Sequence, residues 1–146
     1  MKELNKEELV RFSEQLVSPF ILEIEGYSIQ SSLLDLPLEV RAVPMPTAED
    51  VGNIEEKKIK NNEIYFYTPS LKSAVFNLLR HFRNCAVHKG RIKQVERNGT
   101  SFYYFEDKTT TYTSMRGYIA VDKWDDYIKS LYQTAIGSRK NKPKKE

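Results

Sequence analysis

The sequence predicts a mostly α-helical domain, a bundle with one β-hairpin inserted between a central helix and the C-terminal helix. Three observations indicate this fold. Apolar residues recur at helical spacing over residues 71–86, the dipeptide Asn98-Gly99 separates two runs rich in β-forming residues, and helical spacing returns over residues 124–135. Helical periodicity and a short Asn-Gly turn are strong local signals for these two kinds of element.

The composition is that of one folded domain. The 146 residues are 40% hydrophobic and 29% charged, too apolar for a disordered chain and too charged for a membrane protein. Residues 138–146 hold five basic residues and one acid, a net charge of +4, so the overall charge of +3 leaves −1 for residues 1–137. We therefore predict a single domain over residues 1–137 and a basic, disordered tail over residues 138–146.

Three features predict a cytoplasmic protein that does not span a membrane. No segment approaches the roughly 20 apolar residues that cross a bilayer. The N-terminus, Met1-Lys2-Glu3, lacks the apolar core of a secretory signal. The single cysteine, Cys85, cannot form an intrachain disulfide, and it falls on an apolar helix face, which favours packing over reactivity.

The first helix is predicted to begin at a capping box formed by Asn5 and Glu8. Apolar residues then recur at helical spacing as far as Ile24. Pro19 is expected to kink this helix or to separate two helical pieces, because proline removes an amide donor and crowds the preceding turn.

The segment after the first helix has weaker signals. Leucines over residues 33–38 suggest a short buried piece, and Pro44, Pro46 and the charged stretch through Lys60 suggest a surface connection. The sequence leaves the structure of residues 41–63 open. A short apolar run at residues 64–67 leads to Thr68 and Pro69, which suit the cap and the first position of the central helix.

The central helix is the clearest element in the sequence. Its apolar residues form one wide arc that ends near Gly90, so we predict a continuous helix over residues 70–88. Its buried residues are expected to include Leu71, Val75, Leu78, Phe82 and Ala86.

The hairpin is predicted over residues 91–106, with extended pieces at 109–113 and 117–121 after it. Asp122 is expected to cap the last helix. Aromatic residues of a hairpin alternate between its faces, so about half should pack on the helices. The rest either pack as well, the commoner use, or offer stacking surfaces for bases.

Polar residues of the central helix fall into one narrow stripe beside the apolar arc, at about 100° per residue. The stripe consists of Asn77, His81, Asn84 and His88. Arg83 projects about 140° away from His88, so one straight helix does not aim both side chains at the same atom. A distorted helix end, a guanidinium that swings back, or a second copy of the helix would bring them together.

Arg83, Asn84 and His88 together suffice for metal-free cleavage of a phosphodiester. The 2′-hydroxyl of RNA would be the nucleophile, His88 the general base or acid, and Arg83 the group that stabilises charge on the phosphate. Asn84 would orient a hydroxyl or the imidazole. The alternative is that these are solvated side chains, since every amphipathic helix has a polar face. No pattern in the sequence supplies a partner for His81, so we interpret it as a residue on the flank of the helix or as a hydrogen-bonded histidine on the helix surface.

The run from Leu79 to Ile92 resembles the signature of the HEPN superfamily (higher eukaryotes and prokaryotes nucleotide-binding): Arg83, the polar Asn84, three further residues, then His88. It is most similar to small stand-alone HEPN-like proteins of bacterial plasmids and defence loci. The resemblance implies an all-α bundle, a two-fold dimer, and a metal-independent ribonuclease that uses these three residues in catalysis.

One position departs from the pattern. Lys89 separates His88 from Gly90, where many members have the glycine sooner. Lys89 could bind phosphate, or it could mark a branch that no longer cleaves RNA.

The expected function is that of a HEPN-type endoribonuclease in a toxin–antitoxin, defence or stress-response system. The expected partners are RNA or a nucleotide, a second copy of the chain and a cognate antitoxin protein, while no cofactor and no metal site are expected. The residues expected to bind RNA or phosphate are Lys89, Arg91, Arg80 and His81. Two alternatives stay open: a non-catalytic dimeric module of the same fold that binds a nucleotide, RNA or a protein, and a helical interaction protein in which Arg83 and His88 only bridge the dimer.

Overall fold

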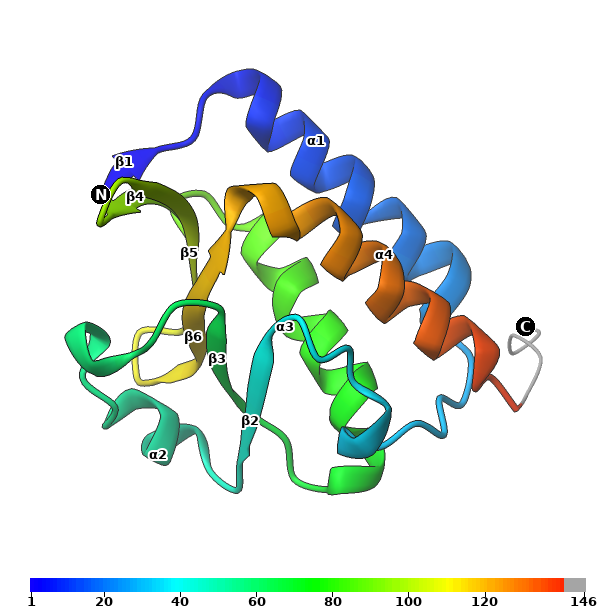
Figure 1. The fold of residues 1–146 in the computed structure, drawn as a ribbon. Helices are drawn as coiled ribbons and strands as arrows, with labels where there is room; N and C mark the ends of the chain where they lie inside the picture. Colours follow the sequence, from blue (N-terminus) through cyan, green and yellow to red (C-terminus); the bar gives the residue numbers. More distant parts are fainter. Residues whose placement is uncertain (141–146) are drawn as a thin grey trace.

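The computed structural model describes residues 1–140 and shows an α/β architecture, in which a six-stranded mixed sheet carries three long helices on one face (Figure 1). The prediction of a mostly α-helical, HEPN-like bundle is therefore wrong, because the sheet extends far beyond the single hairpin that was expected. Most of the predicted basic tail, residues 141–146, lies outside the described residues.

The strands are β1 (Lys2–Glu3), β2 (Arg41–Met45), β3 (Glu63–Tyr67), β4 (Ile92–Arg97), β5 (Thr100–Lys108) and β6 (Thr113–Ala120). The α-helices are α1 (Lys6–Leu16), α2 (Ala48–Gly52), α3 (Ala74–Val87) and α4 (Val121–Gly137). A π-helical turn covers Phe20–Ile24, and short 3₁₀ turns cover Leu33–Asp35, Glu56–Lys58 and Leu71–Ser73.

The strand order is β1-β4-β5-β6-β3-β2, and every neighbouring pair is antiparallel except β2 and β3. The predicted hairpin is confirmed as β4 and β5, which pair Arg97 with Thr100 across the turn. Asn98 and Gly99 both have positive φ, 51° and 81°. Positive φ at both central residues defines the type I′ turn that Asn-Gly favours.

Proline and glycine usually interrupt strands, yet one of each lies inside a strand of this sheet. Pro44 lies in β2, where proline is tolerated because β2 is an edge strand and its missing N–H leaves no central ladder bond unmade. Gly117 lies in the middle of β6 opposite Ile64 of β3. A Cβ at Gly117 would lie 2.3 Å from the carbonyl oxygen of Glu63, so glycine is what allows the two strands to approach.

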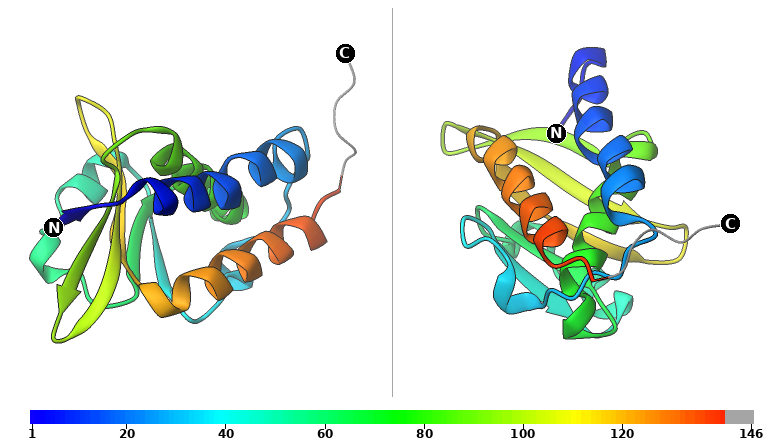
Figure 2. Two further views of the ribbon diagram at one scale, coloured as in Figure 1. Left: turned by 90° about the horizontal axis from the view of Figure 1, so that it is seen from above. Right: turned by 90° about the vertical axis from the view of Figure 1, so that its right-hand side faces the viewer.

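Helices α1, α3 and α4 cover one face of the sheet, and α2 lies on the opposite face (Figure 2). The side chains of β5 alternate between these faces, as a pleated strand requires. Tyr103 and Phe105 join the core under the three helices, whereas Phe102 and Tyr104 join a smaller cluster with Ile59. Both groups are buried, so these aromatic residues pack rather than offering stacking surfaces.

Two predictions for the N-terminal part are confirmed: the capping box at the start of α1 and the break at Pro19. Asn5 and Glu8 form the predicted capping box, with hydrogen bonds of 3.0 and 2.9 Å. Pro19 separates α1 from the π-helical turn, which is one of its two expected roles. Leu34 and Leu38 are 93% and 95% exposed, so the expectation of a buried leucine segment is wrong for both.

The central helix is confirmed as α3, although its α-helical part is shorter than predicted. Val75, Leu78 and Phe82 are fully buried, and Ala86 packs against the core. Leu71 is 56% exposed because it lies in the 3₁₀ turn that precedes α3.

The last helix, α4, begins at Val121, and no side chain caps it, so the expected cap by Asp122 is wrong. None of the helices in residues 1–140 combines the length and apolar character that a membrane span needs.

Candidate functional site

His81 is buried in the middle of α3 and is held at both ring nitrogens. Nδ1 lies 2.8 Å from the carboxylate of Asp107, at the end of β5, and Nε2 lies 2.8 Å from the carbonyl oxygen of Tyr67, at the end of β3. Both partners are acceptors, so both bonds form when His81 carries a proton on each nitrogen. His81 is therefore a structural link between α3 and two strands, not the surface histidine that the sequence suggested.

Asp107 is the centre of this polar cluster. Besides the bond from His81, its carboxylate accepts hydrogen bonds from Asn84 at 3.1 Å, Arg91 at 3.0 Å and Ser114 at 3.3 Å. The residue is only 5% exposed. A buried carboxylate is stable when it is paired and hydrogen-bonded in this way.

The surroundings of Asp107 keep it ionised. Burial alone raises the pKa of this carboxyl, but the hydrogen bond and charge of His81, followed by Asn84 and Arg91, outweigh burial and leave the pKa below its usual value. The cluster therefore holds an ionised carboxylate beside the guanidinium of Arg91.

A cavity of about 530 Å³ opens beside this cluster. One wall is α3, which contributes Arg80, His81 and Asn84. A second wall is the β5–β6 region with Asp107, Tyr112 and Ser114, and a third is formed by Tyr67 and residues 46–49 ahead of and within α2. Three of the sequence-predicted site residues thus meet at one cavity.

Arg80 is the cationic group of the cavity that no carboxylate neutralises. Its one hydrogen bond within residues 1–140 is a long one of 3.4 Å to the amide oxygen of Asn77. Arg91, by contrast, is engaged by Asp107 and its side chain is 22% exposed. Of these two predicted phosphate-binding residues, only Arg80 has a guanidinium available to a ligand.

Arg83 lies on the other flank of α3. Its guanidinium carbon stands 5.1 Å from the centre of the Phe20 ring, and its buried Nε has no hydrogen-bond partner among the described residues. It also faces α4, because its charge opposes the large rise that burial causes in the pKa of Tyr132. Arg83 therefore points away from the cavity that Asn84 lines, on the flank of the helix where the sequence placed it relative to His88.

His88 ends α3 as an exposed residue with an extended backbone, φ −116° and ψ 121°. Its imidazole makes no hydrogen bond within residues 1–140, and Lys89 beside it is exposed and unpaired there. His88 follows Asn84 by four residues, but α3 ends at Val87, so the extended backbone of His88 leaves the helix there. His88 is exposed to solvent and is not one of the residues that line the cavity.

Cys85 is 2% exposed, and burial, followed by the charge of Asp107, raises the pKa of its thiol well above the usual range. It is a packing residue, as its place on the apolar arc predicted. Among residues 1–140, no three histidine, cysteine or acidic side chains gather in a way that could hold a metal ion.

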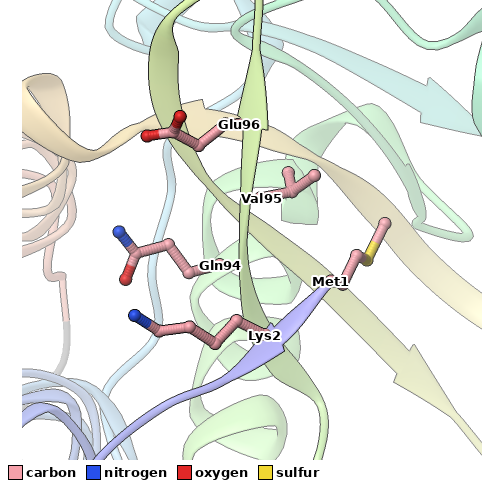
Figure 3. A pocket seen from close by; sticks show the side chains of 5 residues that line it. All are labelled: Met1, Lys2, Gln94, Val95 and Glu96. Atoms are coloured by element: carbon pink, nitrogen blue, oxygen red, sulfur yellow. The ribbon is translucent and has the colours of Figure 1, made fainter.

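A second hollow, of about 380 Å³, lies at the edge of the sheet where β1 pairs with β4. Figure 3 shows that Gln94 and Glu96 point to one side of β4 while Val95 points to the other. The hollow contains none of the predicted site residues, and its side chains do not converge on a point.

No protein-family model, no curated protein and no solved structure matches the chain.

Proposed function

We propose that the chain is a metal-independent endoribonuclease in which His88 transfers the proton. One observation carries this assignment. The chain has two histidines, and His81 has both ring nitrogens occupied, which leaves the exposed imidazole of His88 as the one able to exchange a proton with a substrate. Histidine is the side chain best suited to general acid–base catalysis near neutral pH.

The RNA lies along the side of α3 that carries Arg80, Asn84 and His88. Arg80 and Asn84 lie one turn apart on α3, and His88 is the exposed residue that follows the end of the helix. The 2′-hydroxyl attacks the neighbouring phosphorus and loses its proton to a base, and the bond to the 5′-oxygen breaks as that oxygen takes up a proton. The products are a 2′,3′-cyclic phosphate and a free 5′-hydroxyl, with His88 acting at one of the two proton transfers.

Charge on the reacting phosphate is stabilised by nearby cations. Lys89 stands beside His88, and Arg80 lies about two turns back on α3, beside the stripe. Arg83 of a second copy supplies the further cation of the proposed site, and its guanidinium has to leave the Phe20 ring that it faces within its own chain. This arrangement makes the active form a two-fold dimer with the ends of the two α3 helices close together.

The proposed activity is supported by the local resemblance to the HEPN signature at residues 79–92, where Arg83, Asn84 and His88 match the pattern. It does not rely on the helical bundle, which the sheet replaces. A role in a toxin–antitoxin, defence or stress-response system, with a cognate antitoxin as partner, is part of the same proposal.

The test compares the wild-type protein with His88→Ala on single-stranded RNA in the presence of EDTA. Loss of a proton-transfer group typically slows a reaction by about a hundredfold to ten-thousandfold, so the variant should fall in that range or show no cleavage. Products should end in 2′,3′-cyclic phosphate, and DNA of the same sequence should stay intact. Equal rates for both proteins would identify a contaminating nuclease and refute the proposal.

A second candidate is a non-catalytic module that binds RNA, a nucleotide or a protein partner through the same face. The position of Arg83 favours it, because the three signature residues do not converge within one chain. A protein that binds single-stranded RNA yet leaves it uncleaved, with His88→Ala binding equally well, would select this candidate.

A further inference from the structure

The cavity beside α3 contains groups that have no part in the proposed proton transfer at His88. Its volume of about 530 Å³ lies within the range of about 300–1,000 Å³ found for small-molecule sites. Tyr112 lies on its rim in the turn between β5 and β6, with 51% of its surface exposed. An aromatic ring in this position is available to a planar ligand.

The polar groups of the cavity differ in kind and lie on different walls. Arg80 supplies a guanidinium without an ion pair, which suits a phosphate. Asn84 donates one amide hydrogen to Asp107, so its orientation is fixed while its second hydrogen and its carbonyl oxygen stay available. Glu49 adds a carboxylate on the opposite wall, which keeps a phosphate on the α3 side.

We propose that this cavity binds one nucleotide of single-stranded RNA, with the base stacked on Tyr112, the amide of Asn84 at the base edge or the ribose, and the phosphate at Arg80. The inference rests on the proposed function, which makes RNA the ligand. His88 follows the end of α3, four residues after Asn84, so a nucleotide that leaves the cavity at this end of the helix is the one presented to the imidazole. The cavity thus sets which phosphodiester is presented for cleavage.

Binding is tested apart from cleavage by placing every variant on the His88→Ala background. The probe is a fluorescein-labelled 12-nucleotide single-stranded RNA, and its Kd is measured by fluorescence anisotropy at several salt concentrations. The variants are Tyr112→Ala, Tyr112→Phe and Arg80→Gln. Lys129→Gln is the control, because Lys129 is an exposed cation on α4 outside the cavity lining.

Tyr112→Ala should raise the Kd by about fivefold to more than a hundredfold, the value expected for one lost stacking contact. Tyr112→Phe should bind the RNA as tightly as the parent, which is the protein that carries His88→Ala alone. Arg80→Gln should weaken binding and reduce its salt dependence by about one phosphate contact. Lys129→Gln should change neither quantity.

The outcomes separate this inference from the proposed function. If the parent binds RNA and the wild-type protein cleaves it, but Tyr112→Ala and Arg80→Gln bind as tightly as the parent, the cavity is not the nucleotide site and the inference is wrong. If those variants bind more weakly while the wild-type protein cleaves nothing, the cavity is confirmed and only the catalytic proposal fails. A parent that binds no RNA overturns both.

Discussion

The imidazole of His81, in the middle of α3, lies 2.8 Å from the carboxylate of Asp107, at the end of β5. The hairpin that precedes Asp107 separates the two residues in the sequence by 26 positions. This contact fixes α3 against the sheet at the point where the cavity opens. It also orients Asn84, which donates to the same carboxylate oxygen.

Replacing Asp107 with asparagine should destabilise the fold. The substitution removes the counter-charge of the half-buried Arg91 and the carboxylate that His81 contacts, and breaking a buried ion pair typically costs about 3–5 kcal/mol. The free energy of unfolding in urea at pH 7 measures this loss. Asp126→Asn, at an exposed position of α4, is the control and should stay within about 0.5 kcal/mol of the wild type.

The effect of Asp107→Asn should depend on pH with a definite sign. The pKa of Asp107 is lowered in the folded protein, so the unfolded chain takes up a proton at higher pH than the folded one does. The stabilisation is complete above the ordinary pKa of about 3.9 and is lost as the pH falls through the lower, folded value. Urea titrations between pH 7 and pH 2 should therefore show the gap between wild type and variant shrinking in acid. A gap that widens in acid would contradict the assignment.

Replacing the two histidines in turn should affect two different properties, the stability of the fold for His81 and RNA cleavage for His88. His81→Ala removes two hydrogen bonds from a buried cluster and should lower the free energy of unfolding by about 1–3 kcal/mol or more. His88→Ala alters an exposed side chain and should leave thermal unfolding unchanged while RNA cleavage is lost. Circular dichroism melts together with a cleavage assay compare them. A stable, inactive His81→Ala beside an active His88→Ala would reverse the roles of the two histidines.

Gly117→Ala should be strongly destabilising. The added Cβ would stand 2.3 Å from the carbonyl oxygen of Glu63 and 2.6 Å from the Cα of Ile64, and these are backbone atoms that cannot turn aside. Overpacking of this kind costs about 1–3 kcal/mol or more. Gly137→Ala is the matched control at the end of α4, since nothing lies within 4 Å of its Cβ position. Denaturation midpoints that are equal for the two variants would show that β3 and β6 do not approach this closely.

The chain should form a two-fold dimer, with a mass of twice 17.1 kDa in sedimentation at micromolar concentration. In such a dimer Arg83 of one copy serves His88 of the other. Mixing inactive Arg83→Ala and His88→Ala proteins should then restore part of the activity, because one of the two sites in the mixed dimer is intact. A 17.1 kDa species, or a mixture that stays inactive, would count against a shared site.

Elements with local signals were predictable from the sequence, and those defined by distant pairing were not. The capping box at Asn5, the periodicity of α3 and the Asn98-Gly99 turn each depend on neighbouring residues, and all three are present. Strand β2 depends on its pairing with β3, and no local pattern marks a five-residue edge strand that contains Pro44. Local patterns alone therefore favour a helical bundle, because they reveal the helices and leave most of the sheet unmarked.

For the site, too, the residues on the helix could be predicted from the sequence, and the residue on the sheet was missed. Helical spacing identifies the polar side of α3, and Arg80, His81 and Asn84 do gather at one cavity. Asp107 was missed, although a signal existed. It is in phase with Tyr103 and Phe105, which alternate onto the helix-covered face of β5, so a carboxylate at that position has to be buried and needs partners.

The anchoring of α3 at His81 and Asn84 divides the helix into a held part and a free end. Beyond Cys85 the chain runs through an exposed Val87 and His88 to Gly90, which has a φ of +83°. Amide protons up to the anchored turn should exchange with solvent deuterium only on opening of the core, while those just after it should exchange by local fraying. His88 thus lies at the free end of an anchored helix, and if the proposed contact with RNA is made there, bound RNA should slow deuterium uptake at this end first.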